Sequence, residues 1–534
     1  MNSRSPSHGH GHGQRAGPGA LAVASALAPG EARRILRSVA LLLFLPISVL
    51  TLVAASEDSA SWPIASMRAA LGLVPLAWCL LVITNLATLR DKRHGVAVIT
   101  DVLPASQTAR SIGYLLGGCV GVPVGAGLLL VWFLIHPGSP IGAPDLAELA
   151  VPLLLVAGGA VLGVASARWL PSALFTVPVI LATIFITGQV QRSAVHRARF
   201  LGFVADPPAT LVPELEVRPS TWHLVWLLAW VGIMATVAIL RFDRSRPVIV
   251  TALALVAVAT AAGIAQTRPI GAETATARAG LLNSPGPHQR CREVAGVSYC
   301  SYPSTDDQMD TWTRTVRSVM ANVPVQAHRR DLVVSQRVPW ISGNRNCGPS
   351  RSLDLVDTPI AERVDVEQAW PADGHVHPGI AGESLPCSAV SLGTLFTAVQ
   401  VGAWAVGLPP AQWGEGQTCT ADGQARSAVA LWLGASAGGR LDRYIENVGG
   451  TAGGRADVSD WDNPPTWGVD WHPSDLDAAR AMNDLAEDEV AEAVARHWNE
   501  LVDPSTSTDR LYELLDLGTQ TPTDSARQPT CRPT

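Results

Sequence analysis

Lysine is almost absent from this chain, because Lys92 is the only one among its 39 lysines and arginines. A P-loop needs a lysine that follows glycine and precedes serine or threonine, since this lysine holds the nucleotide phosphates. Lys92 instead lies between Asp91 and Arg93. The chain therefore carries no P-loop, and any ATP hydrolysis on which it depends must come from another subunit. Scarce lysine beside abundant alanine, glycine and valine is typical of GC-rich bacterial coding.

Motifs for metal and covalent chemistry are missing as well. No two of the 8 cysteines are spaced as C-x-x-C, and no His-Glu-x-x-His sequence is present. The segment Gly434–Gly438 matches the nucleophile-elbow pattern around Ser436, but a helix and not a strand is predicted before it. We predict no catalytic residue, no metal site and no cofactor, and we expect the chain not to be an enzyme. The net charge of −6 gives no reason to expect a nucleic-acid partner.

Long apolar runs fill the first half of the chain. Each approaches the length of about 20 residues that a helix needs to cross a hydrocarbon core about 30 Å thick. They run near Val39–Ala55, Ala69–Leu89, Ile112–Ile135, Leu146–Ala167, Ser172–Gln189, Thr221–Leu240 and Val248–Ala265. So many runs in close succession argue against the buried helices of a soluble protein. The sequence predicts an α-helical polytopic membrane domain with about seven transmembrane helices.

The arginines between these runs indicate an orientation, because cytoplasmic loops carry an excess of basic residues. Loops on one side contain Arg33, Arg34, Arg37, Arg90, Lys92, Arg93, Arg110, Arg168, Arg241, Arg244 and Arg246. The loops on the other side are poor in arginine, apart from Arg192, Arg197 and Arg199 after the fifth run. We therefore predict a multi-pass protein of the bacterial cell membrane, with the N-terminus in the cytoplasm and the C-terminal domain outside it.

The cysteines give an independent indication of the same topology. Two of them, Cys79 and Cys119, lie within apolar runs, and the other six follow the last run. An even number of cysteines suits disulfides, which persist outside the cytoplasm. Cys291 and Cys300 flank a short alternating stretch, so we expect a local bridge there, and Cys387 with Cys419 is a second candidate pair. Six cysteines allow 15 pairings, and the sequence does not choose among the rest.

Four parts follow from these patterns. We predict a disordered cytoplasmic arm at 1–37, a transmembrane domain at 38–266, a linker at 267–289 and an extracytoplasmic domain at 290–534. The last part is predicted to be disulfide-containing and mainly α, with α+β as the alternative. Its expected elements are a hairpin at Cys291–Tyr302, a strand at Asp331–Ile341, and helices at Asp310–Asn322, Ser388–Gly407, Ala425–Leu433, Ser474–Leu501 and Thr508–Leu515. The segment Ser388–Gly407 is also long enough to be an eighth span.

The longest loop on the arginine-rich side, Arg90–Ser111, contains a distinctive order of residues. A basic stretch with a glycine is followed by Leu103-Pro104-Ala105-Ser106, and Arg110 and Gly113 then begin the third apolar run. Pro104 disfavours helix at the residue before it, and Ser106 can cap a helix that starts after it. We expect a short amphipathic element on the membrane face, to which a cytoplasmic partner could bind. The alternative is an ordinary basic loop.

In this order of residues, the first half of the chain resembles the permease subunits of bacterial ABC-2-type transporters. The resemblance implies that the loop docks on a cytoplasmic ABC ATPase subunit, and that the permease forms a homodimer or a heterodimer. The residues that it assigns to docking are Arg90, Arg93, Asp101, Leu103, Pro104, Ser106 and Arg110. The family's usual permease has six spans and both ends in the cytoplasm. A seventh span that carries a large exterior domain departs from this pattern.

The sequence thus favours a subunit that lies in the lipid bilayer and belongs to an ATP-driven transporter, in particular an exporter, energised by a separate cytoplasmic ATPase subunit. The alternative is a membrane-anchored receptor, in which the helices hold an extracytoplasmic binding domain at the surface. A membrane-tethered hydrolase is the third hypothesis, and the failed match around Ser436 argues against it.

Overall fold

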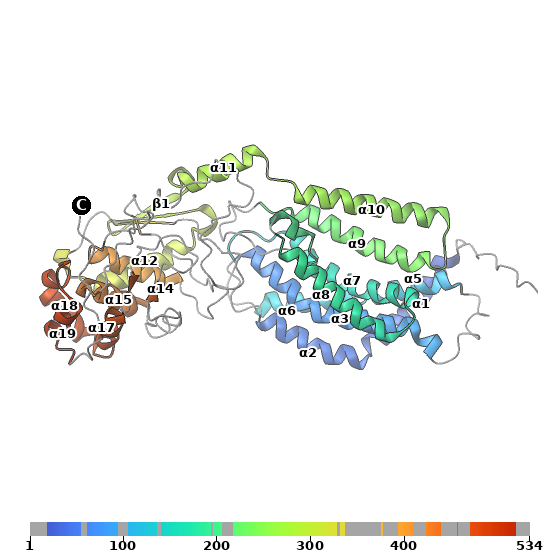
Figure 1. The fold of residues 1–534 in the computed structure, drawn as a ribbon, viewed down its shortest axis with the longest axis horizontal. Coiled ribbons are helices and arrows are strands. Elements are labelled where there is room, and N and C mark those ends of the chain that lie inside the picture. The colour runs from blue at the N-terminus through green and yellow to red at the C-terminus, as the bar shows by residue number, and fades with distance from the viewer. Residues whose placement is uncertain are drawn as a thin grey trace, which may run out of the picture.

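The computed structural model describes residues 19–54, 61–93, 105–135, 140–193, 196–204, 217–327, 332–336, 375–376, 393–408, 423–438, 456–457, 470–471 and 473–518. The fold is mostly helical. A bundle of long helices makes up the first half, and a second group of shorter helices with a small sheet follows it along the chain (Figure 1). Buried apolar residues form separate cores in the two halves.

The bundle contains the helices that the apolar runs predicted, and one more helix, α1 (Gly19–Leu36), before them. The predicted ones are α2 (Val39–Ala54), α3 (Trp62–Arg93), α5 (Gln107–Gly118), α6 (Gly121–Ile135), α7 (Leu146–Trp169), α8 (Thr176–Gln191), α9 (Ser220–Leu240) and α10 (Arg246–Thr267). Within the described residues, 6 helical segments are long and apolar enough to cross a bilayer. The number rises to 7 if α1 and α2, which meet at 65°, form one broken span. These helices indicate a multi-pass membrane protein, as predicted.

Three segments differ from the expectations. The predicted disordered arm is helical from Gly19 onward, because α1 is rich in alanine and leucine and buries Ala24 and Ile35. The predicted linker contains helix α11 (Ala272–Asn283). The long helix expected to end at Leu501 is two helices, α17 (Pro473–Asn483) and α18 (Glu487–Leu501). The amphipathic spacing continues on both sides of a short break, so the sequence pattern alone does not reveal the break.

Helices α3 and α7 pack closely because two glycines of α7 leave room for the backbone of α3. A Cβ atom built on Gly159 would lie 2.2 Å from the carbonyl oxygen of Ala77, and one on Gly163 would lie 2.3 Å from that of Leu81. These glycines are four residues apart, a spacing that lets helices approach closely in lipid. The Thr84 hydroxyl uses this proximity and donates a hydrogen bond to Ala160 O at 2.8 Å.

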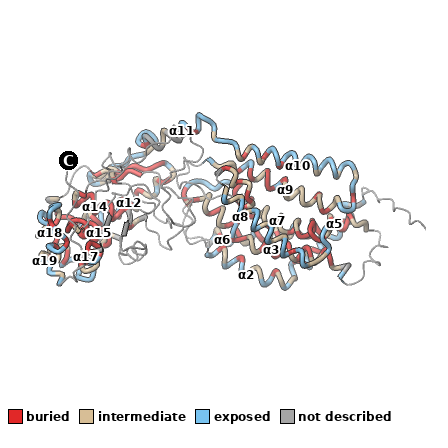
Figure 2. Tube along the Cα trace, viewed as in Figure 1, coloured by how far each residue is buried: buried red, intermediate tan, exposed pale blue. Residues whose placement is uncertain are grey.

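The amide of Asn85 adds a second polar link across the same pair of helices. Its nitrogen donates to Ser166 Oγ at 3.0 Å, and its side chain is fully buried. Interhelical hydrogen bonds of this kind stabilise helix association in a medium that offers no water. The α3–α7 pair is therefore the centre of the bundle. Helices α8 and α10 lie at its surface, because only 6% and 11% of the residues in their most apolar segments are buried (Figure 2).

The second half of the chain has one apolar core built mainly from helices. The helices are α12 (Gln308–Ala321), α14 (Gly393–Ala405), α15 (Ala425–Gly438), α17, α18 and α19 (Thr508–Leu515). Helix α14 lies against α15 and is buried in this core, so the segment predicted at Ser388–Gly407 is a core helix where the structure describes it. Trp312 and Trp432 are among its fully buried side chains. The predicted helices at Asp310–Asn322, Ala425–Leu433 and Thr508–Leu515 are confirmed.

A small sheet packs against this core. Strands β1 (Arg290–Val294) and β2 (Val297–Ser301) form the predicted hairpin, and β3 (Val333–Ser335) pairs parallel to β2. The two-residue turn places Ala295 and Gly296 at φ of 53° and 80°, the backbone that such tight hairpin turns require. A second, two-stranded sheet joins β4 (Ala456–Asp457) to β5 (Asp470–Trp471).

The glycines of α7 give a direct test of the bundle's packing. In an open helical position, Gly→Ala stabilises by about 1 kcal/mol, because alanine restricts the unfolded chain. At Gly163 the added methyl group would collide with backbone and with Thr84. Overpacking of this kind destabilises by about 1–3 kcal/mol, so Gly→Ala should be destabilising there. We expect Gly163→Ala to lower the thermal unfolding midpoint in detergent. Gly127→Ala, at a helical position with open space around it, is the control and should not lower it.

Candidate docking site at the arginine-rich end of the bundle

One end of the bundle gathers the arginines that the sequence places on a single side. Arg168 at the end of α7 lies over the rings of Tyr114 and Phe242, at 5.5 and 5.2 Å from their centroids. Arg241 at the end of α9 lies over the Trp169 ring at 5.5 Å. Helices α1 and α5 lie at this end, away from the C-terminal half of the chain (Figure 1). We call it the arginine-rich end.

Helix α1 is held at this end by close contact with α5. A Cβ atom built on Gly117 would lie 2.8 Å from Glu31 Cβ, and one on Gly113 would lie 3.1 Å from Leu27 Cβ. Gly113 and Gly117 are again four residues apart, so α5 presents a small-residue face to α1. The first helix therefore belongs to the folded bundle, although its residues were predicted to lie in a free arm.

Charged side chains join α1 to the end of α3. Glu31 of α1 accepts hydrogen bonds from Arg34 at 2.7 Å and from Arg90 at 3.0 Å. The Glu31 side chain is 9% exposed, so its charge lies inside the protein surface and needs these cationic partners. Arg90 was predicted to belong to a docking loop, and the structure places it at the junction of α1 and α3.

A groove of about 300 Å³ opens beside this junction. Its polar lining consists of Glu31, Arg34, Ser38, Arg90 and Arg93, and its apolar lining of Ile35, Ile83, Leu86 and Ala87. Two of the predicted docking residues, Arg90 and Arg93, thus share one concave surface with α1. The sequence offered no sign of α1's part in it, because residues 19–36 were not expected to fold.

The structure describes two of the remaining docking candidates, Ser106 and Arg110. Ser106 is the N-cap of α5 and accepts from the backbone N–H of Ala109 at 3.1 Å, as its position predicted. Arg110 lies on the first turn of α5 and is buried. Asp101, Leu103 and Pro104 lie outside the described residues.

The opposite end of the bundle contains a buried charge pair that the sequence analysis did not single out. Glu148 in the first turn of α7 pairs with Arg218, which precedes α9, and both side chains are less than 10% exposed. The Ser220 hydroxyl donates to the same carboxylate at 3.1 Å, and Arg218 lies over the Phe200 ring. Glu148 was overlooked because it follows Asp145 at the border of an apolar run. This pair ties α7 to the start of α9.

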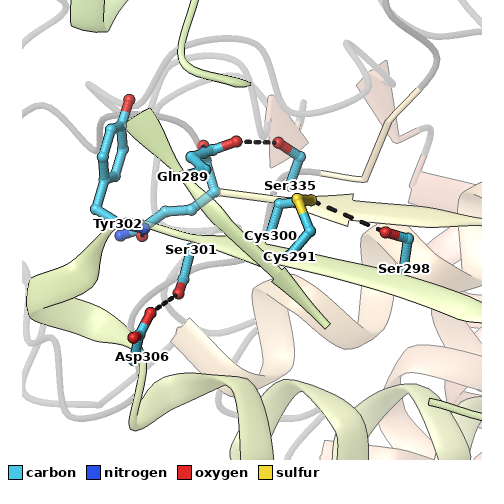
Figure 3. Close-up of a disulfide and its surroundings, with 9 residues drawn as sticks. Gln289, Cys291, Ser298, Cys300, Ser301, Tyr302, Asp306 and Ser335 are labelled. Atoms are coloured by element: carbon cyan, nitrogen blue, oxygen red, sulfur yellow. Dashed lines mark hydrogen bonds between the residues drawn. A yellow bond between two sulfur atoms is a disulfide. The ribbon is translucent and has the colours of Figure 1, made fainter. Parts of the chain in front are cut away.

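The predicted local disulfide is present in the C-terminal half. Cys291 and Cys300 face each other across the β1–β2 hairpin and are joined by an S–S bond, with Cα atoms 4.1 Å apart (Figure 3). The hydroxyl of Ser301 donates to Asp306 beside it, and Ser335 on β3 donates to Gln289. The bridge therefore lies in a hydrogen-bonded corner of the small sheet. Cys387 and Cys419 lie outside the described residues.

Ser436, the serine of the nucleophile-elbow pattern, is not placed as that pattern requires. Ser436 lies within helix α15 and donates to Leu433 O at 3.0 Å, so it is not on a strand-to-helix turn. Among the residues that the structure describes, no three histidine, cysteine or acidic side chains form a group that could hold a metal ion. No family model, curated protein or solved structure matches this chain.

The contact between α1 and α5 can be tested by hydrogen–deuterium exchange. A leucine at residue 117 would occupy the space that Glu31 now fills, so Gly117→Leu should separate α1 from α5. We expect faster exchange of the backbone amides of α1, because exchange reports local opening. The control is Gly188→Leu on α8, where nothing lies within 4 Å. Unchanged exchange in α1 of the Gly117 variant would contradict this packing.

Proposed function

We propose that this chain is the membrane subunit of an ATP-driven transporter of the ABC-2 type, and that it works as an exporter. A separate ATPase subunit docks at the arginine-rich end, in the cytoplasm of a bacterial cell. The C-terminal half lies outside the cytoplasm, where it receives or guides the exported molecule. Two membrane subunits form the transporter, either as two copies of this chain or as this chain with a similar one.

The observation that carries this proposal is the construction of the arginine-rich end. Arg90 and Arg93 end the longest helix of the bundle, and Ser106 begins the next described helix. The residues between them carry the order that resembles ABC-2 permeases. A partner that moves this loop would act directly on α3 and α5. Since α3 packs along α7 through Gly159 and Gly163, a push at this end would reach the centre of the bundle.

The surface of the bundle leaves room for a second membrane subunit. Helices α8 and α10 expose most of their apolar side chains, among them Leu181, Phe185 and Leu253. Lipid covers such faces by default, and a paired subunit would cover part of them. A substrate path between two subunits would then be bordered by spans that this chain alone leaves uncovered.

Association with an ATPase tests the proposal. The chain should be tagged in its own host and purified in a gentle detergent, with the bound proteins identified by mass spectrometry. We expect a nucleotide-binding subunit to co-purify with the wild type, together with ATP hydrolysis that the chain cannot itself perform. The loop variant Asp101→Ala/Leu103→Ala should lose this partner, because both changes lie in the docking loop.

The matched control is Glu273→Ala, which removes an exposed acidic side chain on α11, in the half of the chain that we place outside the cytoplasm. It should retain the ATPase. Wild-type protein that purifies intact but without any nucleotide-binding partner would contradict the transporter proposal.

A membrane-anchored binding protein is the second candidate. The C-terminal half has its own apolar core and disulfide, which is what a separate binding domain needs. In that case the loop variant and the wild type would purify alike, without an ATPase.

A further inference from the structure

The groove at the junction of α1 and α3 has a layout that docking of a protein does not require. Three arginines and one glutamate form its charged lining, and Ser38 with isoleucine, leucine and alanine side chains forms the rest. Two of the apolar side chains, Ile35 and Ile83, are buried at 2% and 7% exposure. Exposed charged side chains and buried apolar ones therefore share one concave surface.

The charges in the lining do not cancel. Glu31 can neutralise one of the three arginines, and it already accepts hydrogen bonds from Arg34 and Arg90. The lining thus holds two more positive charges than negative ones. The side chains of Arg34 and Arg90 are 64% and 33% exposed, and Arg93 is exposed as well, so their guanidinium groups can reach a ligand in the groove. Guanidinium groups bind phosphate oxygens with two parallel hydrogen bonds.

The groove lies where the apolar surface of the bundle ends. The apolar span of α3 ends at Arg90, which lines the groove. Directly after Ser38, which also lines it, α2 begins a face of exposed apolar side chains. Val39, Leu42 and Leu43 of this face are 70%, 62% and 64% exposed. Along the bundle axis, the charged groove is therefore followed by an apolar surface. A phospholipid has the same order, with a charged headgroup followed by apolar acyl chains.

The geometry points to a binding site for an anionic phospholipid, with its headgroup phosphate on Arg34, Arg90 and Arg93 and its acyl chains along α2. Basic pockets between transmembrane helices hold anionic headgroups in this way. An acidic segment of a protein partner would use the arginines but would gain nothing from the apolar face of α2. This inference requires only that the bundle crosses a bilayer, and it does not rest on ATPase docking.

The test compares the full-length wild-type chain with two double variants in detergent that contains either phosphatidylglycerol or phosphatidylcholine. Arg34→Gln/Arg93→Gln removes two positive charges from the groove. Arg33→Gln/Arg37→Gln removes two exposed arginines from the same region of the chain that do not line it. The readouts are the thermal unfolding midpoint, which a ligand of the folded state raises, and the number of lipids retained in native mass spectrometry.

We expect phosphatidylglycerol to raise the midpoint of the wild type by several degrees relative to phosphatidylcholine, and to remain bound in the mass spectrum. The Arg33/Arg37 variant should keep this response, and the Arg34/Arg93 variant should lose most of it. Equal responses of the two double variants would overturn the site, and so would an equal rise caused by inorganic phosphate.

A variant that keeps the groove's charge distinguishes loss of the lipid site from misfolding as the cause of a lost phosphatidylglycerol response. Arg34→Lys/Arg93→Lys should retain part of the phosphatidylglycerol response, because lysine binds phosphate as a point charge but without the paired hydrogen bonds. A wild type that associates with an ATPase but does not respond to phosphatidylglycerol would refute this inference alone. A wild type that responds to phosphatidylglycerol but purifies without an ATPase would refute the proposed function alone.

Discussion

Charge is expelled from hydrocarbon, and the layout of the bundle follows from this constraint. A chain that crosses a bilayer must satisfy its backbone polar groups within each segment, so each apolar run becomes a helix. The arginines then collect where these helices end, and their side chains fold back over aromatic rings, as Arg168 does over Tyr114 and Phe242. The same constraint explains why Glu148, about 30 Å from Arg168 along α7 at 1.5 Å per residue, is buried only in partnership with Arg218.

Within that layout, small residues decide which helices meet. Burial of apolar surface does not drive helices together in lipid, so close approach and interhelical hydrogen bonds must do so. Gly159 and Gly163 let α7 approach α3, and Gly113 and Gly117 let α5 approach α1. The α1 helix reaches the arginine-rich end through the second of these contacts. The groove with its three arginines exists only because α1 is held there.

The sequence predicted the helices of the bundle well, because their signal is the length of an apolar run. It also predicted the Ser106 cap and the Cys291–Cys300 bridge, which depend on neighbouring residues. It missed α1, whose alanine-rich apolar stretch is short, ends at Pro29 and Gly30, and packs against α5. The groove was missed as well, since Glu31 and Arg34 are far from Arg90 in sequence. Residues close together in the sequence give no sign of contacts with segments that lie far along the chain.

We propose that the arginine-rich end and the C-terminal half lie on opposite sides of a membrane. Single cysteines introduced at Arg37, in the arginine-rich end, and at Val325, which is 80% exposed in the C-terminal half, would report the two sides separately. Intact cells should be treated with a membrane-impermeant maleimide, and each variant compared with the parent chain. We expect added labelling of Val325→Cys at once, and of Arg37→Cys only after the cells are broken. Added labelling of Arg37→Cys in intact cells, with Val325→Cys protected, would contradict it.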